Sequence, residues 1–96
     1  MLKILTIVAK IEAKIGKSNQ VKLEALKLIE PTRKEKGCIQ YNLYQDNENP
    51  DIFTFIENWE SQELWQTHIQ SSHLKSFIDV TDGLLINLTI KQMKKI

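Results

Sequence analysis

CIQYNLYQDNENPDIFTFIENW, residues 38–59, lies in the middle of the chain and decides the fold. Residues 38–46 and 52–59 alternate side chains with the period of two that is typical of β-strands. The polar residues 47–51 between them include a proline and form a turn signal. The stretch therefore predicts a β-hairpin, around which the remaining elements are arranged.

A strand and a helix are predicted upstream of the hairpin. Residues 2–13 carry apolar side chains on both faces, which is typical of a central strand that is covered on both sides. Ser18 or Asn19 can cap an amphipathic helix that follows. Pro31 should kink or restart this helix because proline lacks an N–H, and Gly37 should end its last turn.

A second helix and a last strand are predicted downstream. Ser61 can cap the helix, and the serines at 71–72 can interrupt it before it ends near residue 79. A turn at 82–83 leads into a strand over residues 84–93. One face of that strand is expected to carry Ile86, Leu88 and Ile90.

The predicted order is β-α-β-β-α-β, which defines an α+β fold of the ferredoxin-like sandwich type over a single domain, residues 2–93. Both helices should cover one face of an antiparallel sheet. The other face is expected to carry apolar side chains from the first and last strands. We therefore expect a homodimer in which a second protomer covers that face.

Composition restricts the function classes. The chain has 96 residues, 42% of them hydrophobic, with 13 basic and 12 acidic side chains and a net charge of +1. This balance argues against nucleic-acid or anionic-membrane binding, and no apolar stretch approaches the roughly 20 residues that span a bilayer. Cys38 is the only cysteine, which excludes a disulfide framework. With no signal-peptide pattern at the amino terminus, we expect a cytoplasmic protein.

Glu57 is a candidate functional residue. The period of two places it on one strand face together with Phe53, Phe55 and Trp59. A carboxylate among aromatic rings needs a partner or a proton. Glu57 is thus either part of a structural ion pair or a group for proton transfer or substrate orientation.

Arg33 is the only arginine beside twelve lysines, and its planar guanidinium is suited to bidentate pairing. Glu35 and Glu57 are its candidate partners. The alternative is a surface arginine at the end of a helix.

His68 shares a helix side with Leu64 and Trp65, so it should face the sheet, either as a core residue or as a general acid or base. His73 is expected to be solvated. Neither a Cys-x-x-Cys nor a His-Glu-x-x-His spacing is present, so no metal site is predicted. Cys38 lacks an adjacent basic residue and is interpreted as a buried thiol.

Together these residues form an order that resembles the antibiotic biosynthesis monooxygenase family, in particular its small quinol-monooxygenase-like branch. The order is Arg33-x-Glu35-x-Gly37-Cys38-x-x-Tyr41, then Glu57-x-Trp59-x-Ser61, then His68 and His73. The resemblance covers residues 2–93 and implies a dimeric α+β barrel. It also implies oxidation of small quinol-like aromatics by O₂ without metal, flavin or haem.

On this interpretation we expect a pocket between the helices and the sheet. His68 would be the base or orienting group, with Glu57 and Arg33 as its polar support. The substrate-binding candidates are Tyr41, Asn58, Trp59, Trp65 and His73.

Two alternatives remain. One is a non-catalytic ligand-binding or stress-response dimer on the same fold. The other is an RNA-recognition module, which shares the element order and whose stacking aromatics Phe53 and Phe55 faintly mimic. The first strand has no aromatic residue and the net charge is near zero, and both facts disfavour RNA binding.

Overall fold

The computed structural model describes residues 3–96 and confirms the predicted element order, with each predicted helix divided in two. The elements are β1 (Leu5–Ala13), α1 (Ser18–Leu26), α2 (Ile29–Arg33), β2 (Cys38–Gln45), β3 (Ile52–Trp59), α3 (Gln62–Ile69), α4 (Ser72–Val80) and β4 (Leu85–Met93). The expected start of the first strand and of the domain, at Leu2, lies outside the described residues. Over residues 3–96, no helix is long and apolar enough to cross a bilayer.

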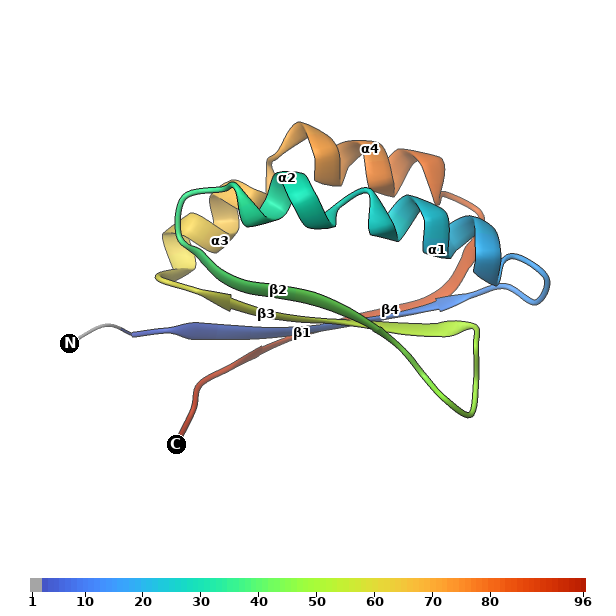
Figure 1. Ribbon diagram of the computed structural model, residues 1–96, viewed down its shortest axis with the longest axis horizontal. Coiled ribbons are helices and arrows are strands. Elements are labelled where there is room, and N and C mark those ends of the chain that lie inside the picture. The colour runs from blue at the N-terminus through green and yellow to red at the C-terminus, as the bar shows by residue number, and fades with distance from the viewer. Residues whose placement is uncertain (1–2) are drawn as a thin grey trace.

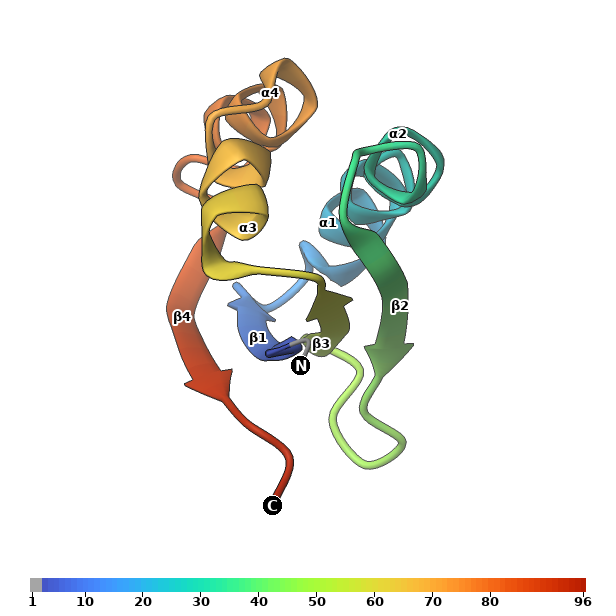
Figure 2. The same cartoon turned by 90° about the vertical axis from the view of Figure 1, so that its left-hand side faces the viewer.

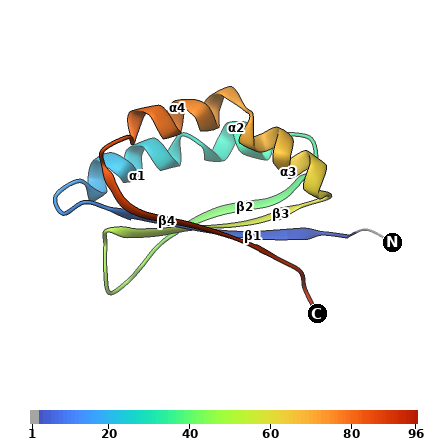
Figure 3. The same ribbon diagram turned by 180° about the vertical axis from the view of Figure 1, so that it is seen from behind.

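The four strands form one antiparallel sheet in the order β2-β3-β1-β4. β1 is a central strand, as its two apolar faces predicted. All four helices lie on the same side of the sheet, and Figures 1, 2 and 3 show this arrangement from three directions. The ferredoxin-like α+β fold is thereby confirmed.

The alternation along β3 divides the sheet into two faces. Phe53, Phe55, Glu57 and Trp59 are buried on the helix side, and the residues between them are half-buried. Phe53 and Phe55 are only 1% and 4% exposed, so neither ring is free to stack on a nucleotide base. Neither residue can therefore serve as the base-stacking aromatic that the RNA-recognition alternative requires.

The face without helices is more polar than predicted. Asn58 lies in its middle, where Thr6 Oγ1 donates to Asn58 Oδ1 at 3.0 Å and Asn58 Nδ2 donates to Gln40 Oε1 at 2.8 Å. This chain of hydrogen bonds crosses β1, β3 and β2. These bonds give hydrogen-bond partners to the polar side chains of Thr6, Asn58 and Gln40.

Leu88 and Ile90 of β4 belong to the helix side. Leu88 pairs with Ile11 and Ile90 pairs with Ala9, and all four line the same cavity beneath the helices. The expectation that the last strand makes the open face apolar is therefore wrong. Leu88 and Ile90 remain 54% and 50% exposed, because this chain's helices leave the edge of the sheet along β4 partly uncovered.

The helix boundaries follow from local chemistry. The Leu64 N–H donates to Ser61 Oγ at the start of α3, which confirms the predicted cap, and Ser71 caps α4 in the same way. The predicted cap at Ser18 or Asn19 is wrong, because Lys17 holds the cap position without a side-chain hydrogen bond. Pro31 lies in the first turn of α2, where its missing N–H costs nothing, so the helix breaks before it.

Gly37 controls how the chain turns from α2 into β2. Its φ is +87°, in the left-handed region that favours glycine. An added Cβ would lie between 2.4 and 3.0 Å from side-chain atoms of Leu64 on α3. Gly37 therefore allows both the turn and the close approach of α3 to the segment that carries Glu35.

Replacement of Gly37 tests this requirement. Gly37→Ala should lower the free energy of unfolding by about 1–2 kcal/mol for the left-handed backbone and by a further 1–3 kcal/mol for the overlap with Leu64. Gly16→Ala is the matched control, because Gly16 has a φ of +83° but nothing within 4 Å of an added Cβ. Urea denaturation of both variants measures the difference, and equal losses would show that the Leu64 contact is unimportant.

Candidate active site

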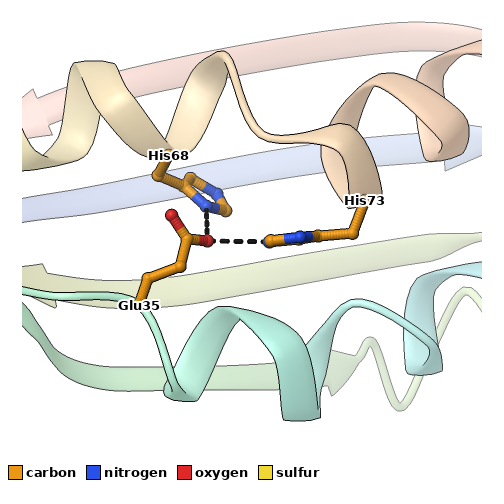
Figure 4. A group of neighbouring side chains, drawn as sticks. All are labelled: Glu35, His68 and His73. Atoms are coloured by element: carbon orange, nitrogen blue, oxygen red, sulfur yellow. Dashed lines mark hydrogen bonds and ion pairs between the residues drawn. The ribbon is translucent and has the colours of Figure 1, made fainter.

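One carboxylate oxygen joins three elements of the structure. His68 Nδ1, on α3, lies 2.6 Å from Glu35 Oε2, and His73 Nε2, near the start of α4, lies 2.7 Å from the same oxygen. Glu35 itself lies in the segment between α2 and β2. Figure 4 shows both imidazole rings directed at this oxygen. The short distances are typical of hydrogen bonds to a charged acceptor.

His68 is the most enclosed member of this cluster, with a side chain that is 3% exposed. Its ring centroid lies 4.9 Å from that of Trp59 and 5.6 Å from that of Tyr41. Burial lowers the pKa of His68, and the hydrogen bond and charge of Glu35 oppose this shift. A neutral His68 whose Nδ1–H donates a hydrogen bond to Glu35 has an unprotonated Nε2, which can accept a proton.

A cavity of about 150 Å³ lies between the helices and the sheet. His68 and Glu57 line it together with Tyr41 and Trp65 and with apolar side chains of β1, β3, β4, α3 and α4. Its outermost lining residues, on α4 and β4, are about half exposed, so the cavity opens between these two elements. Apart from the four residues named first, the lining side chains are apolar.

Glu57 is buried at 4% exposure, and its Oε1 accepts a hydrogen bond from Trp59 Nε1 at 2.9 Å. Burial raises the pKa of Glu57 to about 7, with the Trp59 hydrogen bond acting in the opposite direction and the charge of Glu35 adding to the rise. The carboxyl group therefore exists partly as a neutral acid near neutral pH. A neutral carboxylic acid can donate a hydrogen bond to an oxygen atom in the cavity.

Arg33 does not support either catalytic candidate. Its Nε donates to the Tyr41 carbonyl at 3.1 Å and a terminal nitrogen donates to Asn42 Oδ1 at 2.9 Å. Arg33 is exposed and ties α2 to β2 at the surface. The predicted pairing with Glu57 or Glu35 is therefore wrong, because Glu57 is stabilised by Trp59 and by protonation instead.

Four of the five substrate-binding candidates separate into three groups, and the fifth, His73, does not line the cavity. Tyr41 and Trp65 line the cavity, as predicted. Trp59 is fully buried behind the two polar groups and contacts them rather than the cavity. Asn58 lies on the opposite face of the sheet, since the period of two directs it away from Glu57.

The prediction for His73 is wrong, whereas the structure agrees with the prediction for Cys38. His73 is 22% exposed and bonded to Glu35, so the prediction of a solvated histidine is wrong. Cys38 is half-buried, and burial together with the charges of Glu35 and Glu57 raises the pKa of its thiol. A thiol that stays protonated is a poor nucleophile, which agrees with the predicted structural role.

Glu35 is the residue that sequence reasoning placed wrongly. The sequence offers it as a partner of Arg33, two positions away. The pairing with His68 joins residues 33 positions apart and depends on how α3 packs against the turn at Gly37. The one available signal was its place in the motif Arg33-x-Glu35-x-Gly37.

Glu35, His68 and His73 also form a group that could hold a metal ion, since their donor atoms lie within 4.8 Å of one another. Local spacing predicted no such group because the three residues belong to separate elements. In this arrangement the nitrogen–oxygen distances are those of hydrogen bonds. Zinc ligands, each about 2 Å from the ion, would lie roughly 3.3 Å apart in a tetrahedral site. The geometry is that of a hydrogen-bonded cluster.

Comparison with known proteins agrees with the fold and the motif. The sequence model of the antibiotic biosynthesis monooxygenase family matches residues 4–80. This chain is 30% identical to the probable quinol monooxygenase YgiN of Escherichia coli K12, over 91% of this chain and 93% of that protein. The chain belongs to the antibiotic biosynthesis monooxygenase family.

Two further relatives are similar to the chain to different extents. The crystal structure of PA3566 from Pseudomonas aeruginosa superposes with a TM-score of 0.96 at 32% identity, covering 100% of this chain and 97% of that one. An uncharacterized Synechocystis protein, sll1783, is 35% identical over 57 residues. That match covers 59% of this chain and 39% of the longer relative.

The buried carboxyl predicts a specific pH dependence of stability. Because the pKa of Glu57 is higher in the folded than in the unfolded chain, the folded state holds its proton more tightly, and stability falls as pH rises from about 5 through 7. Between pH 5 and 8 the titration of Glu57 should lower the unfolding free energy of the parent by roughly 2–3 kcal/mol. Glu57→Gln has no such proton to lose, so its unfolding free energy should not show this part of the decrease. Urea denaturation at both pH values measures this, with the exposed Glu60→Gln as control. Parallel pH profiles for parent and Glu57→Gln would contradict the assignment.

Proposed function

We propose that this protein is a monooxygenase that oxidises a small quinol-like aromatic with O₂ and needs no metal, flavin or haem. The observation that carries the proposal is the placement of His68. Its Nδ1 is held by Glu35, and its ring lines an apolar cavity that also contains the Glu57 carboxyl. Membership of the monooxygenase family and the likeness to the probable quinol monooxygenase YgiN support the reaction class.

The cavity favours a flat, largely apolar ligand. Its volume of about 150 Å³ suits one or two fused rings, and Tyr41 and Trp65 offer aromatic contacts. Apolar walls with a few polar groups at defined positions are typical of small-molecule sites. The His68 imidazole and the Glu57 carboxyl would each meet one oxygen of a dihydroxylated ring.

His68 is suited to take the first proton. With Nδ1–H donated to Glu35, the neutral ring would accept a hydroxyl proton of the substrate at Nε2. The negative charge of Glu35 would stabilise the imidazolium that results. Glu35 acts through His68 and is therefore a positioning residue.

Glu57 would act on the second oxygen of the ring. In its neutral form it can donate a hydrogen bond to that oxygen and stabilise the negative charge that develops on the ring. Trp59 holds the carboxyl in place through Nε1. The cavity thus offers one acceptor and one donor.

Removal of the proton produces an electron-rich anion, and this anion can reduce O₂ directly. In the complete reaction, a naphthoquinol and O₂ give a hydroxylated naphthoquinone and one water. One oxygen atom enters the ring and the other leaves as water, so the substrate supplies all the electrons. The protein's residues bind the ring, move a proton and stabilise charge.

Substitution of His68 tests the proposal. His68→Gln keeps a hydrogen-bond donor toward Glu35 but cannot accept the substrate proton, and kcat for aerobic menadiol oxidation should fall by roughly 10²–10⁴-fold. Gln66 is an exposed residue two positions before His68 on α3, and Gln66→Ala should keep the parent rate. Oxygen uptake, corrected for autoxidation, is the measurement, and dialysis against EDTA should not change it.

The alternative outcomes are distinct. If His68→Gln keeps the parent rate, His68 is not the base. If the parent binds menadione but turns over no quinol above the autoxidation rate, the non-catalytic ligand-binding function is favoured instead.

We also propose that the protein is a homodimer, as the family resemblance implies. Ile78, Leu88 and Ile90 are 50–55% exposed beside the mouth of the cavity, and this apolar surface supports association. Light scattering at micromolar concentration should give about 22 kDa, twice the chain mass of 11.2 kDa. A stable species of about 11 kDa would overturn the dimer.

A further inference from the structure

The cluster of Glu35, His68 and His73 brings one carboxylate oxygen and two imidazole nitrogens together from three separate segments of the chain (Figure 4). The three donor atoms all lie within 4.8 Å of one another. Two imidazoles and one carboxylate form a donor set that binds divalent transition metal ions, zinc among them. The cluster therefore has the composition of a three-ligand zinc site, although the proposed reaction uses no metal.

The hydrogen-bonded form of the cluster must expand to take an ion. Its nitrogen–oxygen distances of 2.6 and 2.7 Å would grow to roughly 3.3 Å, the separation of two ligands in a tetrahedral zinc site. Glu35 and His73 have room to move because their side chains are 16% and 22% exposed, whereas His68, at 3%, is held by its packing. The same exposure gives an ion from solvent a route to the cluster.

The charge of the cluster favours a cation. Glu35 supplies a carboxylate, and among residues 3–96 its ion-pair partners are the two histidines rather than a lysine or arginine. A divalent ion would meet one negative oxygen and two neutral nitrogens. Water would complete the fourth position, as it does in zinc sites with three protein ligands.

We propose that Glu35, His68 and His73 bind one zinc ion and that the bound ion inhibits the enzyme. The binding stands on the geometry of the cluster, whereas the inhibition rests on the proposed function of His68 as the base. The ion is a reversible inhibitor and not a cofactor, so the metal-free protein is the active form.

Inhibition follows from the tautomer of His68. In the hydrogen-bonded cluster Nδ1–H donates to Glu35 and Nε2 is unprotonated. A zinc ion on Nδ1 takes the lone pair of that nitrogen, so the one ring proton of neutral His68 must lie on Nε2. A neutral His73 changes in the opposite sense, with the ion on Nε2 and the proton on Nδ1. Neither ring gains or loses a proton, but the His68 atom that would accept the substrate proton is already occupied.

Zinc titration by calorimetry tests the site, on protein dialysed against EDTA and then against metal-free buffer. The parent should bind one ion per chain. His73→Gln keeps a hydrogen-bond donor toward Glu35 but loses a ligand, and its affinity should fall by at least ~100-fold, because loss of an outer-shell partner alone costs roughly 10–100-fold. Gln66→Ala, on α3, and Cys38→Ser, which removes the one thiol, should bind zinc as the parent does. Equal affinity in the parent and His73→Gln would overturn the site.

Two readouts test the consequence for His68. Saturating zinc should lower the parent's kcat for menadiol by at least ~10²-fold, the lower end of the effect of a positioned base. His73→Gln should keep its own zinc-free rate at the same zinc concentration. Zinc is redox-inert, so it adds no oxidation of its own. NMR of the histidine ring nitrogens in the parent should place the His68 proton on Nδ1 without zinc and on Nε2 with zinc.

The outcomes separate the site from the proposed function. Full activity of the zinc-loaded parent, on a quinol that the parent oxidises, would overturn the inhibition. An unchanged His68 tautomer in the zinc-loaded parent would overturn the site, and this measurement needs no variant. If the parent oxidises no quinol, the proposed function fails, while calorimetry and NMR still decide whether the cluster binds zinc.

Discussion

The cost of burying a carboxyl group among aromatic rings governs the helix side of the sheet. β3 alternates strictly, so the strand that fills the core with Phe53, Phe55 and Trp59 must also bring Glu57 inward. Among residues 3–96 no cation pairs with Glu57, and the Trp59 indole is the one hydrogen-bond donor that it has. The remaining cost appears as a raised pKa. A strand selected only for stability would carry an apolar residue here.

Glu35 and His68 answer the same problem in a different way. His68 is as enclosed as Glu57, but it has a carboxylate within 2.6 Å, so its Nδ1 tautomer is set by a strong hydrogen bond. That pairing requires α3 to approach the turn after α2 closely. Gly37 permits the approach, since any Cβ at this position would overlap with Leu64. One glycine thus links the packing of the helices to the tautomer of the base.

The fold was predictable from sequence because it depends on local periodicity. Strand β3 has the predicted bounds, and β1 occupies the predicted central place in the sheet. The facing of Glu57 and His68 followed from the same periodicities. Pairings between distant elements were not predictable, since periodicity says which way a side chain points but not what it meets. For that reason periodicity offers both Glu35 and Glu57 as partners of Arg33, and it does not predict the convergence of His68 and His73 on Glu35.

The two buried titratable groups both favour an uncharged form, which is the protonated form for Glu57 and the singly protonated form for His68. Burial favours the neutral form of both, so Glu57 tends to keep its proton and His68 tends to lack its second one. With Glu57 in its protonated form, the cavity holds a donor and an acceptor without a net charge of its own. An apolar ring can enter such a cavity without displacing a strongly hydrated ion. Charge develops only when the proton moves to His68, where the Glu35 carboxylate is already in place to stabilise it.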